Sequence, residues 1–128
     1  AADAAIDVYR EQGLIENSKE RGAQLSEWLK HLKARFDVIG DVRNLGLFGT
    51  IDFVKSRKTK APLQPYPSSG DAASWTGRLR DGLRRRNVHI AQKWTHLFIA
   101  PPLCITASEL DEGMALIEDT LNEIGEPN

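Results

Sequence analysis

Apolar residues recur at helical spacing in three stretches of the chain. In the longest, Leu25, Leu29 and Leu32 belong to a stripe over residues 14–36 that lies beneath a charged face. Spacings of three, four and seven residues are typical of an amphipathic helix, which must bury its stripe against another element. We expect a shorter, alanine-rich helix before it that ends at Gly13, because glycine tolerates the left-handed conformation that commonly terminates a helix.

The last helix has the clearest start signal. Thr106 followed three residues later by Glu109 is a capping box, in which each side chain accepts a hydrogen bond from the other residue's backbone N–H. A third helix is predicted over residues 72–86, with apolar positions four residues apart from Trp75 to Leu83. The apolar stripe of the last helix consists of Leu110, Met114, Ile117, Leu121 and Ile124.

Apolar and polar residues alternate singly over residues 38–43 and 47–54, which predicts two half-buried β-strands. Because only Asn44–Gly46 separates them, they form either an antiparallel pair or one strand interrupted by a bulge at Gly46. Residues 55–71, rich in Lys, Pro and Ser, predict one long loop. Loops of this length usually carry function or contact another domain, and the sequence leaves a docking segment and a plain exposed insertion equally open.

A second pair of short strands is predicted at residues 88–91 and 96–100, joined as a hairpin around residues 92–95. The hairpin ends before Pro101, because proline cannot donate to a strand ladder. The order of elements predicts a single α+β domain over residues 1–128. We expect a two-layer sandwich, with helices on one face of a small, mostly antiparallel sheet.

Composition excludes several classes of partner. The chain carries 17 Lys+Arg and 18 Asp+Glu, a net charge of −1, and so has no excess positive potential to hold nucleic acid. The basic run Arg84–Arg86 falls in the last turn of the third helix, where cations interact favourably with free carbonyl groups. No apolar run approaches the roughly 20 residues of a membrane span, so we expect no membrane partner. A single cysteine, Cys104, excludes an intramolecular disulfide and fits a cytoplasmic protein.

Candidate chemistry is sparse, and no catalytic residue or metal ligand is predicted. His89 and His96 flank the second hairpin without a third ligand at a recognisable spacing. Cys104 is expected to be a small buried hydrophobe, because no base accompanies it. Strand alternation places Asp52 opposite its apolar neighbours, on an exposed face. The residues alone therefore predict no self-contained active site.

Several motifs, in this order, resemble the C-terminal small domain of class III pyridoxal-phosphate-dependent aminotransferases. They are AIDVYREQGLIEN at residues 5–17, GDVRNLGLFG at 40–49, FIAPPLCIT at 98–106 and ELDEG at 109–113. The resemblance extends over essentially the whole chain and implies the small domain of the fold type I enzymes. Because the chain begins at Ala1 without Met or an apolar leader, we expect it to be a piece of a larger protein.

The resemblance also implies that the cofactor-binding residues belong to another domain of the enzyme. In this family a large domain upstream supplies the lysine that binds pyridoxal phosphate, so no cofactor-binding residue is assigned in this chain. We expect the chain alone to be inactive and to retain no cofactor. The resemblance further implies a large-domain partner and a parent enzyme that is a homodimer or larger. It implies transfer of an amino group from an amino acid or amine to a 2-oxo acid such as pyruvate.

Two substrate-binding residues follow from the same resemblance. Ornithine-type relatives carry an arginine at the position of Phe98, whereas this hairpin offers Lys93 beside Trp94. The lysine binds a carboxylate as a point charge, or it is a solvated turn residue. The alternative to the aminotransferase reading is a free-standing α+β module that binds a ligand or dimerises, since a fold pattern alone supports either.

Overall fold

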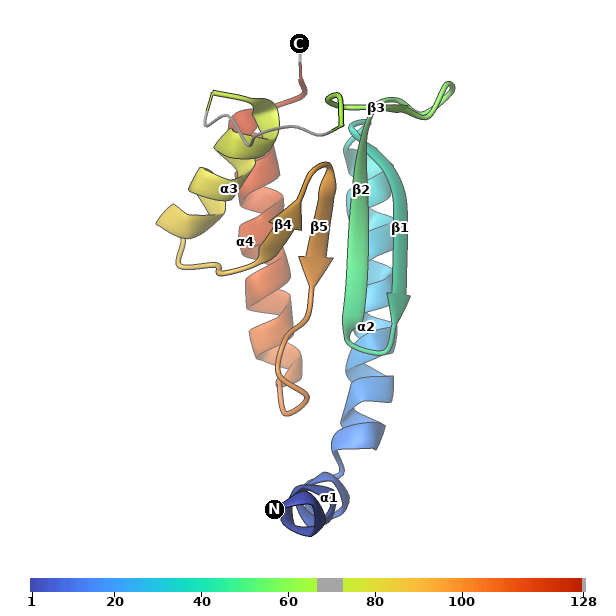
Figure 1. The fold of residues 1–128 in the computed structure, drawn as a ribbon, viewed down its shortest axis with the longest axis vertical. Helices are drawn as coiled ribbons and strands as arrows, with labels where there is room; N and C mark the ends of the chain where they lie inside the picture. Colours follow the sequence, from blue (N-terminus) through green and yellow to red (C-terminus); the bar gives the residue numbers. More distant parts are fainter. Residues whose placement is uncertain (67–72, 128) are drawn as a thin grey trace.

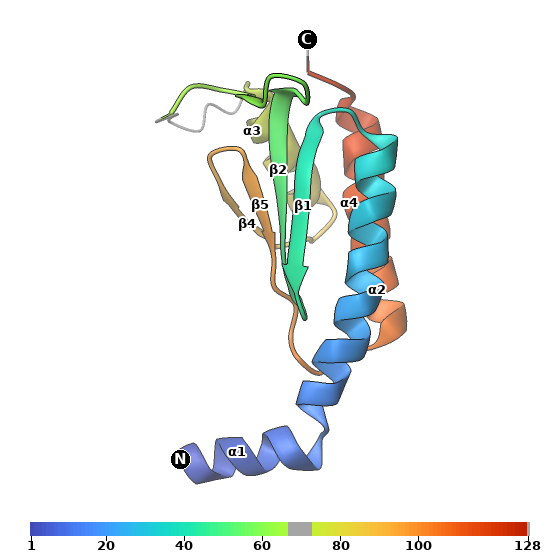
Figure 2. The same cartoon turned by 90° about the vertical axis from the view of Figure 1, so that its right-hand side faces the viewer.

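The computed structural model describes residues 1–66 and 73–127, and its sheet is covered by helices on one face (Figures 1 and 2). The sheet order is β1-β2-β5-β4, and β3 pairs with the far end of β2, all antiparallel. The predicted α+β fold class is confirmed. In chain order the elements are α1 (Ala2–Glu11), α2 (Leu14–Arg35), β1 (Ile39–Leu45), β2 (Phe48–Ser56), β3 (Ala61–Pro62), α3 (Trp75–Arg85), β4 (Ala91–Lys93), β5 (His96–Ile99) and α4 (Ala107–Ile124).

The core lies between the sheet and the layer formed by α2, α3 and α4. Figure 2 shows α2 and α4 side by side on one face of the sheet, with the other face free of helices. We call these two faces the inner face and the outer face. The stripes predicted for the helices are buried, because they meet the inward residues of the strands. Fully buried residues of this core include Leu25, Leu29, Leu32, Ile51, Phe53, Leu79, Leu83, Leu97, Met114 and Leu121.

The first strand pair forms a hairpin, which decides between the two arrangements left open by the sequence. Gly46 lies in its turn with a left-handed φ of 55°, whereas the irregularity in the register lies between Ile39 and Asp41. Val38 and Ile39 are both buried, because Val38 lies in the turn before β1 and is not bound by the alternation of the strand.

Two of the predicted boundaries were wrong. The second hairpin begins at Ala91, since residues 88–90 form no strand. The predicted loop 55–71 contains the end of β2 and the short strand β3. The third helix begins at Trp75, where the Ser74 hydroxyl accepts a hydrogen bond from Gly77 N–H and caps the helix. Its predicted start at residue 72 lies outside the described residues.

Helix α2 approaches the β1–β2 turn closely at a pair of glycines. A Cβ atom on Gly22 would lie 2.7–2.8 Å from backbone atoms of Gly46. Asn44 bridges the two segments, because its Nδ2 donates to the carbonyls of Gly22 and Gly46 at 2.9 and 3.0 Å. Only glycine fits at position 22, since real Cβ atoms do not approach backbone atoms this closely.

Gly22→Ala is therefore expected to lower the free energy of unfolding by roughly 1–3 kcal/mol, the usual cost of overpacking. Gly113→Ala is the matched control, because Gly113 also lies inside a helix and a Cβ there would meet nothing within 4 Å. The control should be more stable than the parent by about 0.5–1 kcal/mol, from helix propensity. Urea unfolding of the three proteins measures both effects. Equal stability of the two variants would contradict the close contact.

Helices α2 and α4 are joined by a polar cluster at Glu118. Its Oε1 lies 2.7 Å from His31 Nε2 and 2.5 Å from Arg35 Nη1, and its side chain is 13% exposed. Burial raises the pKa of Glu118, but the hydrogen bonds and charges of His31 and Arg35 outweigh it, so the pKa lies below 4.5. The ionised carboxylate therefore stabilises the fold above about pH 4.5, and this contribution is lost as the pH falls through the lowered folded pKa.

We expect Glu118→Gln to lower the free energy of unfolding at pH 7 by on the order of 1 kcal/mol. Because the variant lacks the titrating group, its stability should fall less than that of the parent between pH 5 and pH 3. Glu27→Gln is the control, since Glu27 is exposed and, among the described residues, forms an ion pair with Lys30 alone. Denaturant unfolding at a series of pH values gives the comparison. An acid dependence unchanged in Glu118→Gln would refute the assignment.

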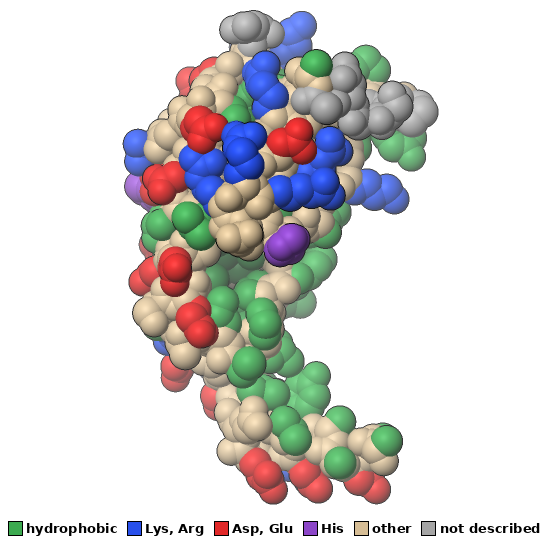
Figure 3. Space-filling view, turned by 90° about the vertical axis from the view of Figure 1, so that its left-hand side faces the viewer, with side chains coloured by type: hydrophobic (Ala, Val, Ile, Leu, Met, Phe, Trp, Pro, Cys, Tyr) green, Lys and Arg blue, Asp and Glu red, His purple; other side chains and the backbone are tan. Residues whose placement is uncertain are grey.

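Helix α1 lies apart from this sandwich. None of its residues is buried, and Ile6, Val8 and Tyr9 are all exposed. Figure 2 shows it projecting beneath the outer face of the sheet, and Figure 3 shows its hydrophobic side chains turned toward the body and its acidic ones away. An isolated helix of this length is marginal in water, so α1 needs a partner surface to be stable. No helix within the described part of the chain is long and apolar enough to span a bilayer.

Candidate functional site

The outer face carries polar and aromatic residues aligned across the strands. The register places Asp41, Asp52, His96 and Lys93 opposite one another in a row across β1, β2, β5 and β4. Directly opposed residues of antiparallel strands project from the same face of a sheet. The neighbouring row contains Arg43, Thr50, Phe98 and Ala91.

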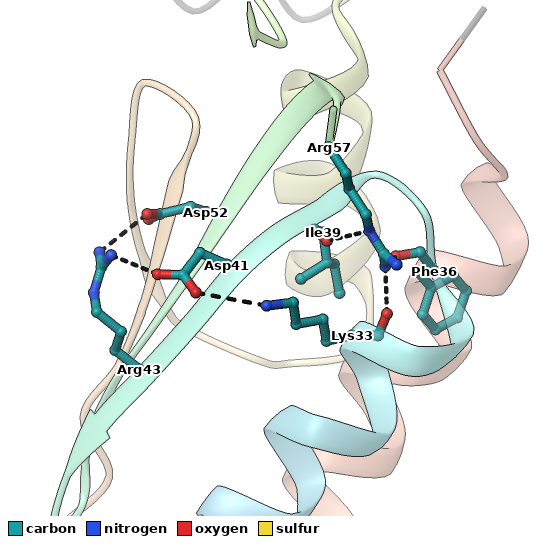
Figure 4. Close-up of polar contacts among 7 residues, drawn as sticks. All are labelled: Lys33, Phe36, Ile39, Asp41, Arg43, Asp52 and Arg57. Carbon is teal, nitrogen blue, oxygen red and sulfur yellow. Dashed lines mark hydrogen bonds and ion pairs between the residues drawn. The ribbon is translucent and has the colours of Figure 1, made fainter. Parts of the chain in front are cut away.

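Ion pairs connect these rows into a chain of alternating charge (Figure 4). Asp52 Oδ1 lies 2.5 Å from His96 Nδ1, and Asp52 Oδ2 lies 3.0 Å from Arg43 Nη2. Arg43 Nη1 contacts Asp41 at 2.7 Å, and Asp41 lies 3.6 Å from the Lys33 ammonium of α2. The side chain of Asp52 is only 19% exposed, so its two partners compensate the loss of hydration. The prediction that Asp52 lies on an exposed face missed this pairing.

These residues border a groove of about 440 Å³ on the outer face. Trp94 forms one wall, and its backbone has a left-handed φ of 55° at the β4–β5 turn. The indole Nε1–H donates to the carbonyl of Gln64 at 2.9 Å, and the ring meets Tyr66 and His96 edge-on. These contacts fix the indole, so that the groove has one rigid aromatic wall.

Arg57 lies at the far end of the groove and has a structural role. Figure 4 shows its guanidinium turned toward the end of α2. It donates to the carbonyls of Lys33, Phe36 (2.6 Å) and Ile39 (2.9 Å). Carbonyl groups at the end of a helix lack intrahelical partners, so Arg57 caps α2 and joins it to β1.

Of the two predicted substrate-binding residues, Trp94 lines the groove and Lys93 is exposed at the end of β4. Lys93 lies directly opposite His96 in the register, on the same face as the groove. Sequence reasoning missed the pairing of Asp52 with His96, because the two residues are 44 positions apart and only the register brings them together. An acidic residue between the apolar Ile51 and Phe53 was the one available signal.

The other two candidate residues, His89 and Cys104, lie where the described residues give them no chemical partner for a metal site or a nucleophile. His89 is exposed, and no group of three or more His, Cys, Asp or Glu side chains in the described ranges is placed to hold a metal ion. Cys104 is exposed, so the prediction of a buried cysteine was wrong; the loop that follows the two prolines turns its side chain outward. Asn17 holds this loop instead, by donating to the carbonyls of Leu103 and Ile105 at 2.7 and 3.0 Å.

Comparison with known protein families identifies the family of this chain. A family model described as aminotransferase class-III matches residues 1–121. The chain belongs to the class III aminotransferases. The chain is 32% identical over 97% of its length to an uncharacterised aminotransferase, y4uB, of Sinorhizobium fredii. It is also 32% identical over 97% of its length to a taurine–pyruvate aminotransferase of Bilophila wadsworthia.

A solved structure gives the same result for the fold. An amine transaminase from an uncultivated Pseudomonas species superposes with a TM-score of 0.85 at 31% identity over 97% of this chain. The chain spans 26–27% of the length of these three class III proteins. The family resemblance seen in the sequence is thus confirmed.

Proposed function

We propose that this chain is the C-terminal domain of a pyridoxal-phosphate-dependent aminotransferase, in which it forms one wall of the substrate site. The observation that carries the proposal is an aminotransferase class III domain whose outer sheet face, with its groove, is free of helices. The parent enzyme moves an amino group from an amino acid or amine donor to a 2-oxo acid such as pyruvate. The taurine–pyruvate and amine transaminase relatives support these substrate classes.

The partner of the outer face is the large domain of the same enzyme. This chain spans only about 26% of the length of the Sinorhizobium aminotransferase y4uB, so most of such an enzyme consists of residues that this chain does not contain. Phe48 is exposed and stacks on Phe98 with ring centroids 6.3 Å apart, and α1 presents its apolar side beneath the same face. Apolar rings and an unsupported helix on one side of a domain are typical of an interface. The parent is a homodimer or larger, and we place it in the cytoplasm.

The lysines of this chain do not fit the cofactor. A lysine that binds pyridoxal phosphate needs a desolvated amine, and the cofactor supplies the electron sink for amino-group transfer. Every lysine of this chain lies in the described residues, and each is exposed or half-exposed: Lys19, Lys30, Lys33, Lys55, Lys58, Lys60 and Lys93. We therefore assign the cofactor lysine to the large domain and derive no chemical step from this chain.

Lys93 and Trp94 contribute to substrate selection in this proposal. Lys93 is an exposed point charge at the edge of the sheet, and Trp94 is a fixed wall of the groove. An ammonium group beside the site attracts a distal carboxylate or sulfonate without the geometric selectivity of a guanidinium. The parent enzyme is therefore expected to accept ω-amino acids with acidic tails as well as plain amines.

The first experiment tests for cofactor in the chain itself. The chain is incubated with pyridoxal phosphate, desalted and examined by absorbance between the protein band and the visible. We expect no retained absorbance and no aminotransferase activity, whereas the chain joined to its upstream coding sequence should show both. A band that borohydride fixes to one lysine of this chain would overturn the proposal. So would an upstream sequence without a large domain, which would favour a free-standing binding module.

The second experiment uses Lys93→Met in the complete enzyme. Removing the ammonium should raise KM for substrates with a distal carboxylate by about fivefold, the effect of on the order of 1 kcal/mol, and leave plain amines within twofold. Lys19→Met is the control, because Lys19 is an exposed lysine of α2 outside the groove. Equal changes for both classes of substrate, or none for either, would reduce Lys93 to a solvated turn residue.

A further inference from the structure

Helix α3 contains four arginines and has a fifth, Arg86, as its C-cap, and the structure places four of these five in two groups. Figure 3 shows that basic side chains gather on the face that carries this helix. Arg85 and Arg86 both pair with Glu123 of α4, Arg85 at 2.8 Å. Arg80 and Arg84, one helical turn apart, line a separate hollow of about 200 Å³ with His89. No carboxylate is among the described residues that line this hollow.

The end of α3 does not need these two arginines. Arg86 Nη1 donates to the carbonyl of Gly82 at 3.2 Å, and Val88 N–H donates to that of Leu83 at 2.9 Å. Asn87 N–H donates to the carbonyl of Arg84 at 3.0 Å. The carbonyls of Gly82, Leu83 and Arg84 are thus already bound, so the usual attraction of cations to a helix end does not explain Arg80 and Arg84.

Two polar atoms of the hollow-lining residues are buried without a hydrogen-bond partner in the described structure. One is the donor Arg80 Nε, which lies 3.6 Å from Asp81 Oδ1, beyond hydrogen-bond distance. The other is the acceptor Gln92 Oε1, whose amide nitrogen is already bound to the carbonyl of Thr76 at 3.0 Å. Buried polar atoms without a partner usually mark the place of a water molecule or a ligand.

We propose that this hollow binds a small phosphoryl oxyanion, either inorganic phosphate or a phosphate monoester. Arg80 and Arg84 supply N–H donors of fixed geometry to the oxygens, and His89 also lines the hollow. At about pH 5 inorganic phosphate and a phosphate monoester both carry a protonated oxygen, because the second pKa of a monoester is about 6. That oxygen donates to Gln92 Oε1, which sulfate, having no proton, cannot do. Val88 and Ile90 form an apolar wall, on which the organic part of a monoester packs. The site is separate from the groove on the outer face.

The test uses the chain itself in phosphate-free buffer at about pH 5 and constant ionic strength, so that both phosphates carry a proton. Nuclear magnetic resonance follows the side-chain N–H groups of the arginines and Gln92 while inorganic phosphate, phenyl phosphate or sulfate is added. We expect saturable shifts at Arg80 Nε–H and at the amide of Gln92 with both phosphates, tighter binding of phenyl phosphate, and at least fivefold weaker binding of sulfate. Tighter binding of phenyl phosphate favours a monoester ligand, and equal binding favours inorganic phosphate; either supports the phosphoryl site.

Two variants separate this site from general attraction to basic residues. Arg84→Gln should weaken phosphate binding about tenfold, and it should fold normally because Arg84 is exposed. Arg85→Gln, on the same helix but paired with Glu123, should leave binding within twofold. The proposal is overturned by shifts that do not saturate, by sulfate binding as tightly as phosphate, or by equal losses in the two variants. None of these results bears on the aminotransferase proposal.

Discussion

The contact between Gly22 of α2 and the turn at Gly46 sets the distance between the helix layer and the sheet. With no side chain at either position, α2 lies directly on the β1–β2 hairpin. The same closeness recurs at Gly49, where a Cβ would lie 3.2 Å from Leu25. The leucines of α2 therefore fill the inner face, where α4 and α3 complete the core. A larger residue at this contact would tilt the helix and open that core.

Because the inner face is filled by the core, the charged residues and the groove lie on the outer face of the sheet. Aspartate inside a strand is unfavourable unless its charge is compensated, and Asp52 pairs with the Arg43 guanidinium on one neighbouring strand and contacts His96 Nδ1 on the other. The contacts among Asp41, Arg43, Asp52 and His96 link β1, β2 and β5 on the face that lacks helices. They also give the groove its polar border, beside the fixed indole of Trp94. The same residues therefore stabilise the sheet and form the polar border of the groove.

Local patterns were enough to predict the helices, the second hairpin and the α+β class, but they left the first strand pair open between a hairpin and one bulged strand. The capping box at Thr106 and Glu109 is present as predicted, because its hydrogen bonds involve residues only three positions apart. Features that depend on register were missed, among them the irregularity at Ile39 and the pairing of Asp52 with His96. Register is set by tertiary packing, which single-strand alternation does not encode. The placement of Lys93 and Trp94 at a substrate site rests on family resemblance and is still a prediction.

The central claim is that the outer face is covered by a large domain in the complete enzyme. Hydroxyl-radical footprinting of this chain and of the complete enzyme tests it directly, with Phe48, Phe98 and Trp94 as reporters. In the chain alone the exposed ring of Phe48 should be oxidised readily. In the complete enzyme we expect all three aromatic residues to be protected at least fivefold, while Ile15, exposed at the start of α2, serves as the reference for overall dose. Equal oxidation of the three residues in both proteins would show that the outer face stays open and would contradict the account.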